Sequence, residues 1–335
     1  MNKFFTLLVS VLCVMAILCS CGTTVTEQTT EPTEEITTER VNTAVNVSVL
    51  KGPTGMQMAY LMHTVNSGEY DGKNVYSFNV ETAADAVTSD LVSGKTDIAA
   101  IPSNAAAALY AKTEGKVKII ATNTLNVLCL LAKDGVVSDF ASLEGKTITA
   151  SGEGTTAQYI LEKILSANGL VPGENVTVEY TAEHSESVTR AKEGLCDIVV
   201  LPEPFATQLL LADCGFVKAI DFSACIESMG LDIVMGVYVV RTEFLEQNPE
   251  AVAEFLSDGL ASHTFLTSSC DVAATYIEEA DIMTAAVAAK AIPNIAFRFK
   301  TGDEMKEMCN GMFELLYEVN PQSIGGALPD EGIYY

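Results

Sequence analysis

One short pattern occurs twice in this chain of 335 residues, and the two copies lie 100 positions apart. Each copy reads Gly-x-x-Asp-Ile, then apolar residues and a proline, at 94–102 and again at 194–202. A short apolar run bounded by turn residues predicts a buried strand. Because only two copies occur, the pattern favours two related halves over a solenoid of stacked repeats. Chance similarity between two ordinary strand–helix units is the alternative.

Strand-like and helix-like segments alternate around both copies. In the first half, strand patterns at 45–50, 74–80 and 117–122 flank segments with helical spacing, and the second half repeats this order from residue 146. Such alternation is typical of βαβ units and mainly parallel sheets. About 290 residues follow the N-terminal segments, enough for two separate cores. We therefore predict an α/β fold with two lobes, each a mostly parallel sheet with flanking helices.

The first 21 residues have the pattern of a targeting segment. Lys3 precedes an apolar run at 4–18, which is short for a membrane span. The run ends in Leu-Cys-Ser-Cys, which resembles a bacterial lipobox with Cys21 as the lipidated residue. We expect a lipoprotein signal peptide at 1–21 and a lipid anchor on the extracytoplasmic face of the cell membrane. A transmembrane anchor and an ordinary signal peptide are the alternatives.

Residues 22–44 predict a disordered tether. Nine of these 23 residues are Thr and five are Glu, so the segment has too little apolar surface to order itself. The whole chain has a formal net charge of −25, which argues against nucleic acid as a partner and against docking on anionic lipid. The lipid anchor is therefore the only membrane contact that we expect.

The cysteines and histidines show no pattern of a metal site. An even number of cysteines after Cys21 permits disulfides in an exported protein, but the spacing lacks the density of a disulfide scaffold. We favour small buried side chains in a reducing habitat and leave the pairing open. No sequence motif predicts a metal or a cofactor. The six cysteines are Cys129, Cys196, Cys214, Cys225, Cys270 and Cys309.

Polar loops follow several of the predicted strands. In open parallel sheets, ligands bind beyond the carboxyl ends of the strands, near the N-termini of helices. If the two halves form facing lobes, these loops line a single cleft. Each loop residue also has a structural explanation, because Ser, Thr and Asn at helix starts are common N-caps and Glu203 can stabilise a helix N-terminus.

The sequence predicts no catalytic residues. The glycine-rich loops lack the lysine of a P-loop and the spacing of GxGxxG, and no GxSxG or HExxH motif occurs. Asp97 and Asp197 precede their strands, at the end away from the expected cleft, so we interpret them as turn residues. None of the four arginines falls in a predicted cleft loop, which argues against a bidentate carboxylate clamp. Glu203 would favour a hydrogen-bond donor or a cationic centre.

The lipobox, the acidic tether and the motifs VLKGPTGMQMAYLM, VSGKTDIAAIPSNAAA, SLEGKTITASGEGTTAQYIL and DIVVLPEPFAT together resemble the substrate-binding proteins of bacterial ABC importers. The nearest group is similar to the binders of nitrate, taurine, alkanesulfonates and thiamine pyrimidine precursors. The resemblance covers residues 45–319. It implies a type II periplasmic-binding-protein-like fold, with one lobe at 45–128 plus 236–335, the other at 129–235, and two crossing strands as the hinge.

The resemblance also implies a ligand site. By position, the ligand loops of the family fall here on Gly52, Pro53, Thr54, Gly55 and Met56, on Ser103 and Asn104, on Thr122 and Asn123, on Gly154, Thr155 and Thr156, and on Glu203 and Phe205. The chain has no Trp, so any aromatic stacking would come from Phe or Tyr. It also lacks the cysteine-rich motif and the histidine donor of the fungal thiamine-pyrimidine synthase.

The expected function is a monomeric solute receptor. It would capture a small organic or oxyanion-type solute by hinge closure and deliver it to the permease and ATPase subunits of an ABC importer. One alternative is an enzyme on the same fold, of the thiamine-pyrimidine or menaquinone-pathway type. The other is a sensor lipoprotein that works without a transporter. The identity of the solute stays open.

Overall fold

The computed structural model describes residues 42–335 except 223–224, 227, 229 and 231. The predicted signal peptide, the lipidation at Cys21 and the tether up to residue 41 lie outside the described residues. The first strand, β1 (Thr43–Leu50), includes the last two residues of the predicted tether. The reason is pairing, since Thr43 and Ala44 align with Asn74 and Val75 of the next strand.

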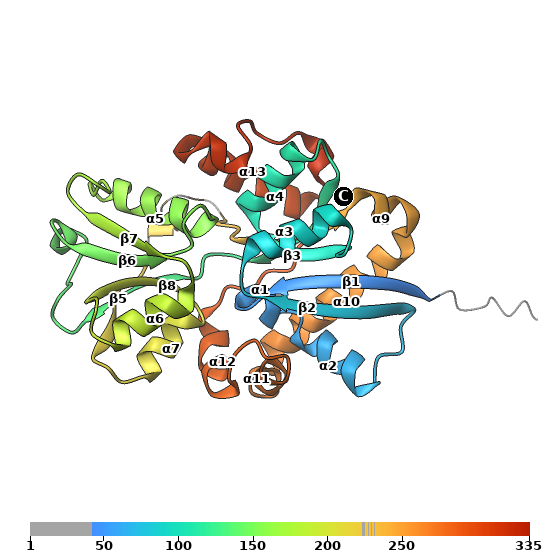
Figure 1. Cartoon of the computed structure of the whole chain (residues 1–335), viewed down its shortest axis with the longest axis horizontal. Helices are drawn as coiled ribbons and strands as arrows, with labels where there is room; N and C mark the ends of the chain where they lie inside the picture. Colours follow the sequence, from blue (N-terminus) through green and yellow to red (C-terminus); the bar gives the residue numbers. More distant parts are fainter. Residues whose placement is uncertain (1–41, 223–224, 227, 229, 231) are drawn as a thin grey trace, which may run out of the picture. The chain divides into compact units, whose positions relative to one another are not determined.

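The described strands form two five-stranded sheets, one in each lobe (Figure 1). The first sheet has the order β2-β1-β3-β10-β4, and the second has the order β7-β6-β8-β5-β9. In the first sheet the strands are β1, β2 (Asn74–Glu81), β3 (Ile98–Pro102), β4 (Val117–Thr124) and β10 (Gly236–Arg241). In the second they are β5 (Leu128–Lys133), β6 (Thr147–Ser151), β7 (Thr177–Thr181), β8 (Ile198–Pro202) and β9 (Phe216–Ile220).

Each sheet is mostly parallel, as predicted, and its one reversed strand has a topological cause. Strand β10 runs antiparallel to both β3 and β4, and β5 runs antiparallel to both β8 and β9. β5 enters the second sheet directly from β4, and β10 returns from β9 to the first sheet. The two reversed strands are therefore the ones that cross between the lobes, which confirms the predicted fold class.

Helices flank both sheets. Those of the first lobe are α1 (Pro53–Met56), α2 (Ala59–Ser67), α3 (Ala84–Ser93), α4 (Ser103–Lys112), α9 (Thr242–Gln247), α10 (Pro249–Ser268), α11 (Cys270–Glu279), α12 (Ala285–Ala291) and α13 (Gly302–Val319). Those of the second are α5 (Thr156–Ala167), α6 (His184–Lys192) and α7 (Phe205–Leu211). Among the described residues, no helix combines the length and hydrophobicity that a bilayer span requires.

The repeated pattern occupies the same structural position in both lobes. Gly94 and Gly194 follow α3 and α6 with φ angles of 77° and 73°, a left-handed conformation that favours glycine. The residues after them enter β3 and β8, which pair with β1 and β6 in parallel. The two copies thus occupy equivalent strand–helix units in the two lobes.

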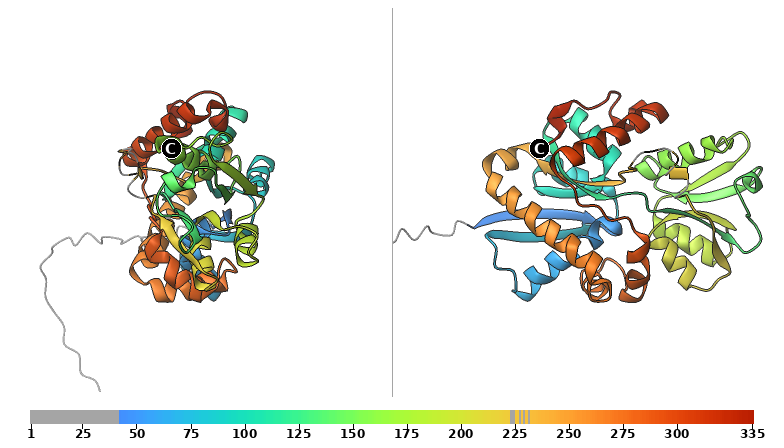
Figure 2. Two further views of the ribbon diagram at one scale, coloured as in Figure 1. Left: turned by 90° about the vertical axis from the view of Figure 1, so that its left-hand side faces the viewer. Right: turned by 180° about the vertical axis from the view of Figure 1, so that it is seen from behind.

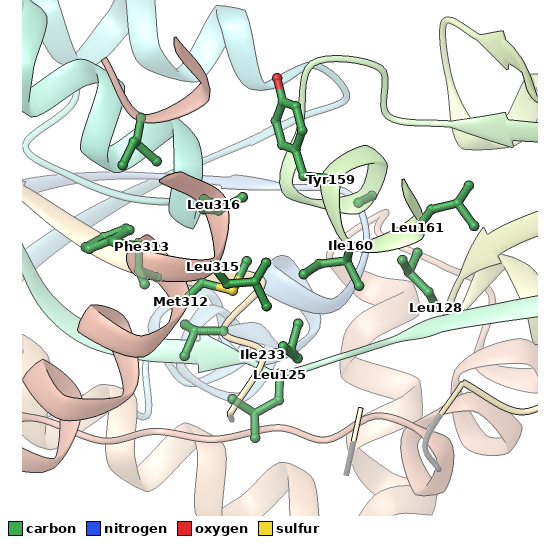
Figure 3. Packing of buried hydrophobic residues seen from close by; sticks show 14 of the residues in the cluster. Leu125, Leu128, Tyr159, Ile160, Leu161, Ile233, Met312, Phe313, Leu315 and Leu316 are labelled. Atoms are coloured by element: carbon green, nitrogen blue, oxygen red, sulfur yellow. The ribbon is translucent and has the colours of Figure 1, made fainter. Parts of the chain in front are cut away.

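The C-terminal helix connects the two lobes. Helix α13 contacts α5 of the second lobe, and Figure 2 shows the two side by side from behind. Their apolar faces share one buried cluster with residues of the interlobe links (Figure 3). Lys163 Nζ also lies 2.7 Å from Glu318 Oε2 across this contact. The labelled members of the cluster are Leu125, Leu128, Tyr159, Ile160, Leu161, Ile233, Met312, Phe313, Leu315 and Leu316.

All six cysteines in the described part of the chain are free thiols. Cys129 and Cys309 are buried, and burial raises the pKa of each thiol to about 12. A thiol with so high a pKa stays protonated and is a poor nucleophile near neutral pH. These two cysteines therefore act as small core side chains, as we favoured from the sequence.

Candidate functional site

A cavity of about 550 Å³ lies between the two lobes. Its volume is in the range of small-molecule sites. The first lobe contributes the ends of β1 and β2 and the starts of α1 and α3, and the second contributes the ends of β6 and β7 and the starts of α5 and α6. The principal lining residues are Leu50, Lys51, Pro53, Thr54, Thr82, Ala83, Ala84, Asp85, Thr124, Val127, Gly152, Glu153, Thr155, Thr156, Tyr180, Thr181, Ala182, Glu183, His184, Met235 and Gly236.

Three longer helices begin at this cavity. Helix α5 is capped by Thr155, whose Oγ1 accepts a bond from the Ala157 N–H at 3.3 Å and donates to the Gly152 carbonyl at 2.6 Å. Helices α3 and α6 have N-caps without a side-chain hydrogen bond, at Ala83 and Glu183. Their first backbone N–H groups are therefore open to a partner in the cavity.

Four of the predicted site residues line the cavity. They are Pro53 and Thr54 on the first lobe and Thr155 and Thr156 on the second. Gly55 and Met56 lie behind this lining: Met56 is fully buried, and a Cβ at Gly55 would come within 2.6 Å of the Leu50 carbonyl oxygen. The loop after β1 thus places Thr54 at the cavity, and glycine at position 55 permits the close approach of the backbone.

Ser103 and Asn104 contact the opposite lobe instead of lining the cavity. Asn104 Oδ1 accepts bonds from the Thr156 N–H at 3.0 Å and from Thr156 Oγ1 at 2.9 Å, and its Nδ2 donates to the Gly154 carbonyl at 3.0 Å. Ser103 Oγ donates to the Val234 carbonyl at 2.7 Å. The sequence predicted that these residues lie at the carboxyl end of their strand, and the structure bonds them to Gly154 and Thr156 of the opposite lobe.

Thr122 and Asn123 lie below the cavity. Thr122 Oγ1 donates to the Arg298 carbonyl at 2.6 Å and accepts from the Lys300 N–H at 3.0 Å. Asn123 Nδ2 donates to the Thr54 carbonyl at 3.3 Å, so this side chain supports a loop that does line the cavity. Both side chains are fully buried.

Glu203 caps a helix. The side chain is 3% exposed, and its Oε2 accepts a bond from the Thr207 N–H at 3.0 Å, in the first turn of α7. Burial raises the pKa of Glu203. Its position is therefore explained by this helix cap. Gly52 and Phe205 lie close to each other, since a Cβ at Gly52 would be 4.0 Å from the Phe205 ring, and neither residue is among those that line the cavity.

Two segments of the lining were not predicted from the sequence, at 82–85 and 180–184. The first segment follows β2 and begins α3 at Ala84. The second includes the end of β7 and begins α6 at His184. These starts lie 100 positions apart, like the repeated pattern. The rule that ligands bind at carboxyl ends of parallel strands, applied to β2 and β7, would have found them.

His184 is a lining residue whose pKa is strongly lowered. Its Nδ1 lies 2.5 Å from Ser151 Oγ, and its ring centroid lies 5.0 Å from that of Phe205. Burial lowers the pKa of His184 to about 4, although part of the side chain faces the cavity. The imidazole is therefore neutral near pH 7. Because Ser151 is 5% exposed and has no other described acceptor, its hydroxyl donates to Nδ1 and leaves the proton on Nε2.

Tyr180 adds a second polar group to the lining. Its hydroxyl is buried and has no hydrogen-bond partner among the described residues. Burial and the nearby charges of Glu162 and Glu153 raise the pKa of Tyr180, so it stays a neutral phenol. A buried donor without a partner costs roughly 1–3 kcal/mol, and no described residue recovers this cost for Tyr180.

Comparison with known structures shows the same fold. An ABC transporter protein from Parabacteroides distasonis has 22% identity and a TM-score of 0.74, over 88% of this chain and 99% of that chain. The aliphatic sulphonate binding protein SsuA from Escherichia coli has 15% identity and a TM-score of 0.68, over 84% and 90%. The nitrate-binding protein NrtA from Synechocystis PCC 6803 has 16% identity and a TM-score of 0.56, over 79% and 74%.

The sequence itself also identifies a family. No match was found among curated proteins. The family model described as NMT1/THI5 like matches residues 77–269, which is more than half of the chain and includes β2 to β10 of both lobes. The chain belongs to the NMT1/THI5-like family.

Proposed function

We propose that this protein is an extracytoplasmic solute receptor, the substrate-binding subunit of an ABC importer. The observation that supports this most strongly is the cavity of about 550 Å³ whose lining is shared between two lobes. A solute held there touches both lobes at once, so its binding energy favours the closed arrangement over the open one. The names of the similar structures, an ABC transporter protein and binders of sulphonate and nitrate, support the same role.

The partners follow from this role. A receptor of this type presents its closed form to membrane permease subunits, while other chains hydrolyse ATP on the cytoplasmic side. The proposed location is the extracytoplasmic face of the cell membrane, with the monomer held by a lipid on Cys21. A sensor without a transporter would bind the solute equally well, and loss of uptake on deletion of this chain distinguishes the receptor from the sensor.

An enzyme on the same fold is the second candidate, and the Ser151–His184 pair is the observation that favours it. The geometry is poor for nucleophilic catalysis. Ser151 is 5% exposed, and among the described residues His184 makes no hydrogen bond to a carboxylate that would orient it as a base. The pair fits a ligand-positioning role better than a catalytic one.

The test is a matched pair of tryptophan variants. Ala182 is exposed and lines the cavity, whereas Ala141 is exposed and lies outside it. In a thermal-shift screen of sulfonates, nitrate, pyrimidines and amines, a solute at one hundred times its Kd should add about 2.7 kcal/mol of stability to the wild type. A182W should lose this gain because the indole fills the cavity, and A141W should keep it. Binding that survives in A182W, or turnover of a bound compound, contradicts the proposal.

A further inference from the structure

The charged side chains around the cavity are mostly acidic. Asp85 comes from the first lobe, and Glu153 and Glu183 come from the second. Among the described lining residues, the only cationic side chain is Lys51, whose Nζ forms an ion pair with Asp281 Oδ2 at 2.8 Å. The neutral His184 adds no charge near pH 7.

The three lining carboxylates have no cationic partner in the described part of the chain. None of them takes part in an ion pair, and all three residues are exposed. The only side-chain hydrogen bond to any of them comes from Ser185 Oγ, which lies 3.1 Å from Glu183 Oε2. Their negative charge is therefore available to whatever enters the cavity.

The helix N-termini do not offset this charge. Helices α3, α5 and α6 each present a partial positive charge of about half an elementary charge at the cavity. Three such half-charges are smaller than the three full charges of Asp85, Glu153 and Glu183. With the Lys51–Asp281 pair counted as zero, the charges of the described lining thus sum to a negative value, and the formal net charge of −25 has the same sign.

We propose that the solute of this receptor carries a positively charged nitrogen, and that this charge lies between the acidic residues of the two lobes. The proposal rests on the receptor function proposed above and names its ligand class. Carboxylates on both sides of the cavity repel each other as the lobes approach, and a cation between them removes this repulsion. A cationic solute would therefore drive closure, whereas an oxyanion would meet the same negative potential and bind poorly.

The rest of the lining suits the remainder of such a solute. Leu50, Pro53, Val127 and Met235 offer apolar surface, and Tyr180 offers a ring beside its unpartnered hydroxyl. An aromatic face also attracts organic cations. The expected ligand is a compact organic ammonium or amidinium compound with an apolar body.

The test compares probes that differ in charge at nearly constant shape. Choline and its neutral isostere 3,3-dimethylbutan-1-ol form one pair, and agmatine and putrescine extend the cationic set. Taurine, ethanesulfonate and nitrate form the other arm. We expect binding, measured by thermal shift and calorimetry, from at least one cationic probe, with an affinity that falls as ionic strength rises.

Variants that neutralise one carboxylate at a time test whether Asp85 and Glu153 contribute to the affinity for the cationic probe. D85N and E153Q should each weaken the binding of that cationic probe by about three- to tenfold, because each removes one attractive charge. E144Q is the matched control, since Glu144 is exposed, outside the cavity and free of side-chain hydrogen bonds to described residues. It should leave the affinity unchanged.

The outcomes separate this inference from the receptor function. The proposed ligand class is wrong if no cationic probe binds. It is also wrong if an anion or the neutral isostere binds and D85N and E153Q leave that binding unchanged or improve it. If such an anion or neutral compound still loses its binding in A182W, the receptor function stands. Binding of any probe that is unaffected in A182W overturns both.

Discussion

The carboxylate of Asp97 holds three donors together in the first lobe. Its Oδ2 accepts bonds from the backbone N–H and the Nδ2 of Asn46, both at 2.9 Å, and its Oδ1 accepts from Arg241 at 2.7 Å. Asp97 is 4% exposed, so these bonds are shielded from water. The role is structural, which agrees with our interpretation of this aspartate as a turn residue distant from the cleft.

Asp197, the residue equivalent to Asp97 in the second copy of the repeated pattern, provides a control for the stability measurement. Asp197 is exposed and has no side-chain partner among the described residues. We expect D97A to lower the free energy of unfolding by about 2–4 kcal/mol, because it removes a buried carboxylate with its three hydrogen bonds and leaves Arg241 paired only with the exposed Glu243. D197A should change it by less than about 0.5 kcal/mol. Urea denaturation of both variants measures this, and equal losses would contradict the structural difference between the copies.

The lowered pKa of His184 predicts that the free energy of unfolding depends on pH. Its pKa is about 4 in the folded protein and about 6.5 when unfolded, so the unfolded state binds more protons between these values. Stability therefore falls as the pH drops from 6.5 to 4, by up to about 3 kcal/mol from this residue alone. H184Q, which cannot be protonated, should lack this part of the pH dependence. An NMR titration that gives His184 a pKa near 6.5 would contradict the assignment.

At the scale of elements, the contact between the starts of α4 and α5 determines how the lobes meet. Asn104 makes three hydrogen bonds to Gly154 and Thr156 across the lobes. N104A removes all three, and we expect a broader range of lobe separations and a stability loss of about 1–3 kcal/mol. Small-angle scattering of the unliganded protein measures the first effect. N79A, at an exposed position on β2, is the control, and identical scattering from N104A and N79A would show that Asn104 does not restrain the lobes.

Most of the elements could be predicted from the sequence because their signals are local. Apolar runs and turn residues located the strands, and glycines after α3 and α6 ended those helices. The helical spacing of residues 56–65 predicts one helix, but the structure has α1 and α2 with a break at Gln57, whose carbonyl accepts a bond from Ser262 Oγ of α10. The apolar pattern at 294–299 predicts a strand, but Asn294 ends a short 3-10 helix and Phe297 forms only an isolated bridge to Thr124 of β4.

The residues that line the cavity could be predicted only in part, because their positions depend on contacts between the lobes and not on local sequence. The sequence places loops at the carboxyl ends of strands, but it does not fix how far each loop reaches into the cleft. Thr54, Thr155 and Thr156 line the cavity, while Asn104 is used for a contact between the lobes and Glu203 for a helix cap. That division depends on how the lobes approach each other, which no local pattern encodes.

At the scale of the whole molecule, the described lobes are joined by more than the crossing strands. The buried cluster shared by α5 and α13 and the ion pair between Lys163 and Glu318 add a connection beside the interlobe links. Any movement of the lobes must therefore either preserve or break this contact. Hinge closure around the cavity is the mechanism that we propose.

Small-angle X-ray scattering with a bound solute tests hinge closure around the cavity most directly. The first solute that stabilises the protein in the thermal-shift screen is added at saturating concentration, and the radius of gyration is compared with that of the free protein. We predict a decrease for the wild type and for A141W, and no change for A182W, in which the cavity is filled. A solute that binds the wild type without changing its radius of gyration, or that compacts A182W equally, would contradict closure around this cavity.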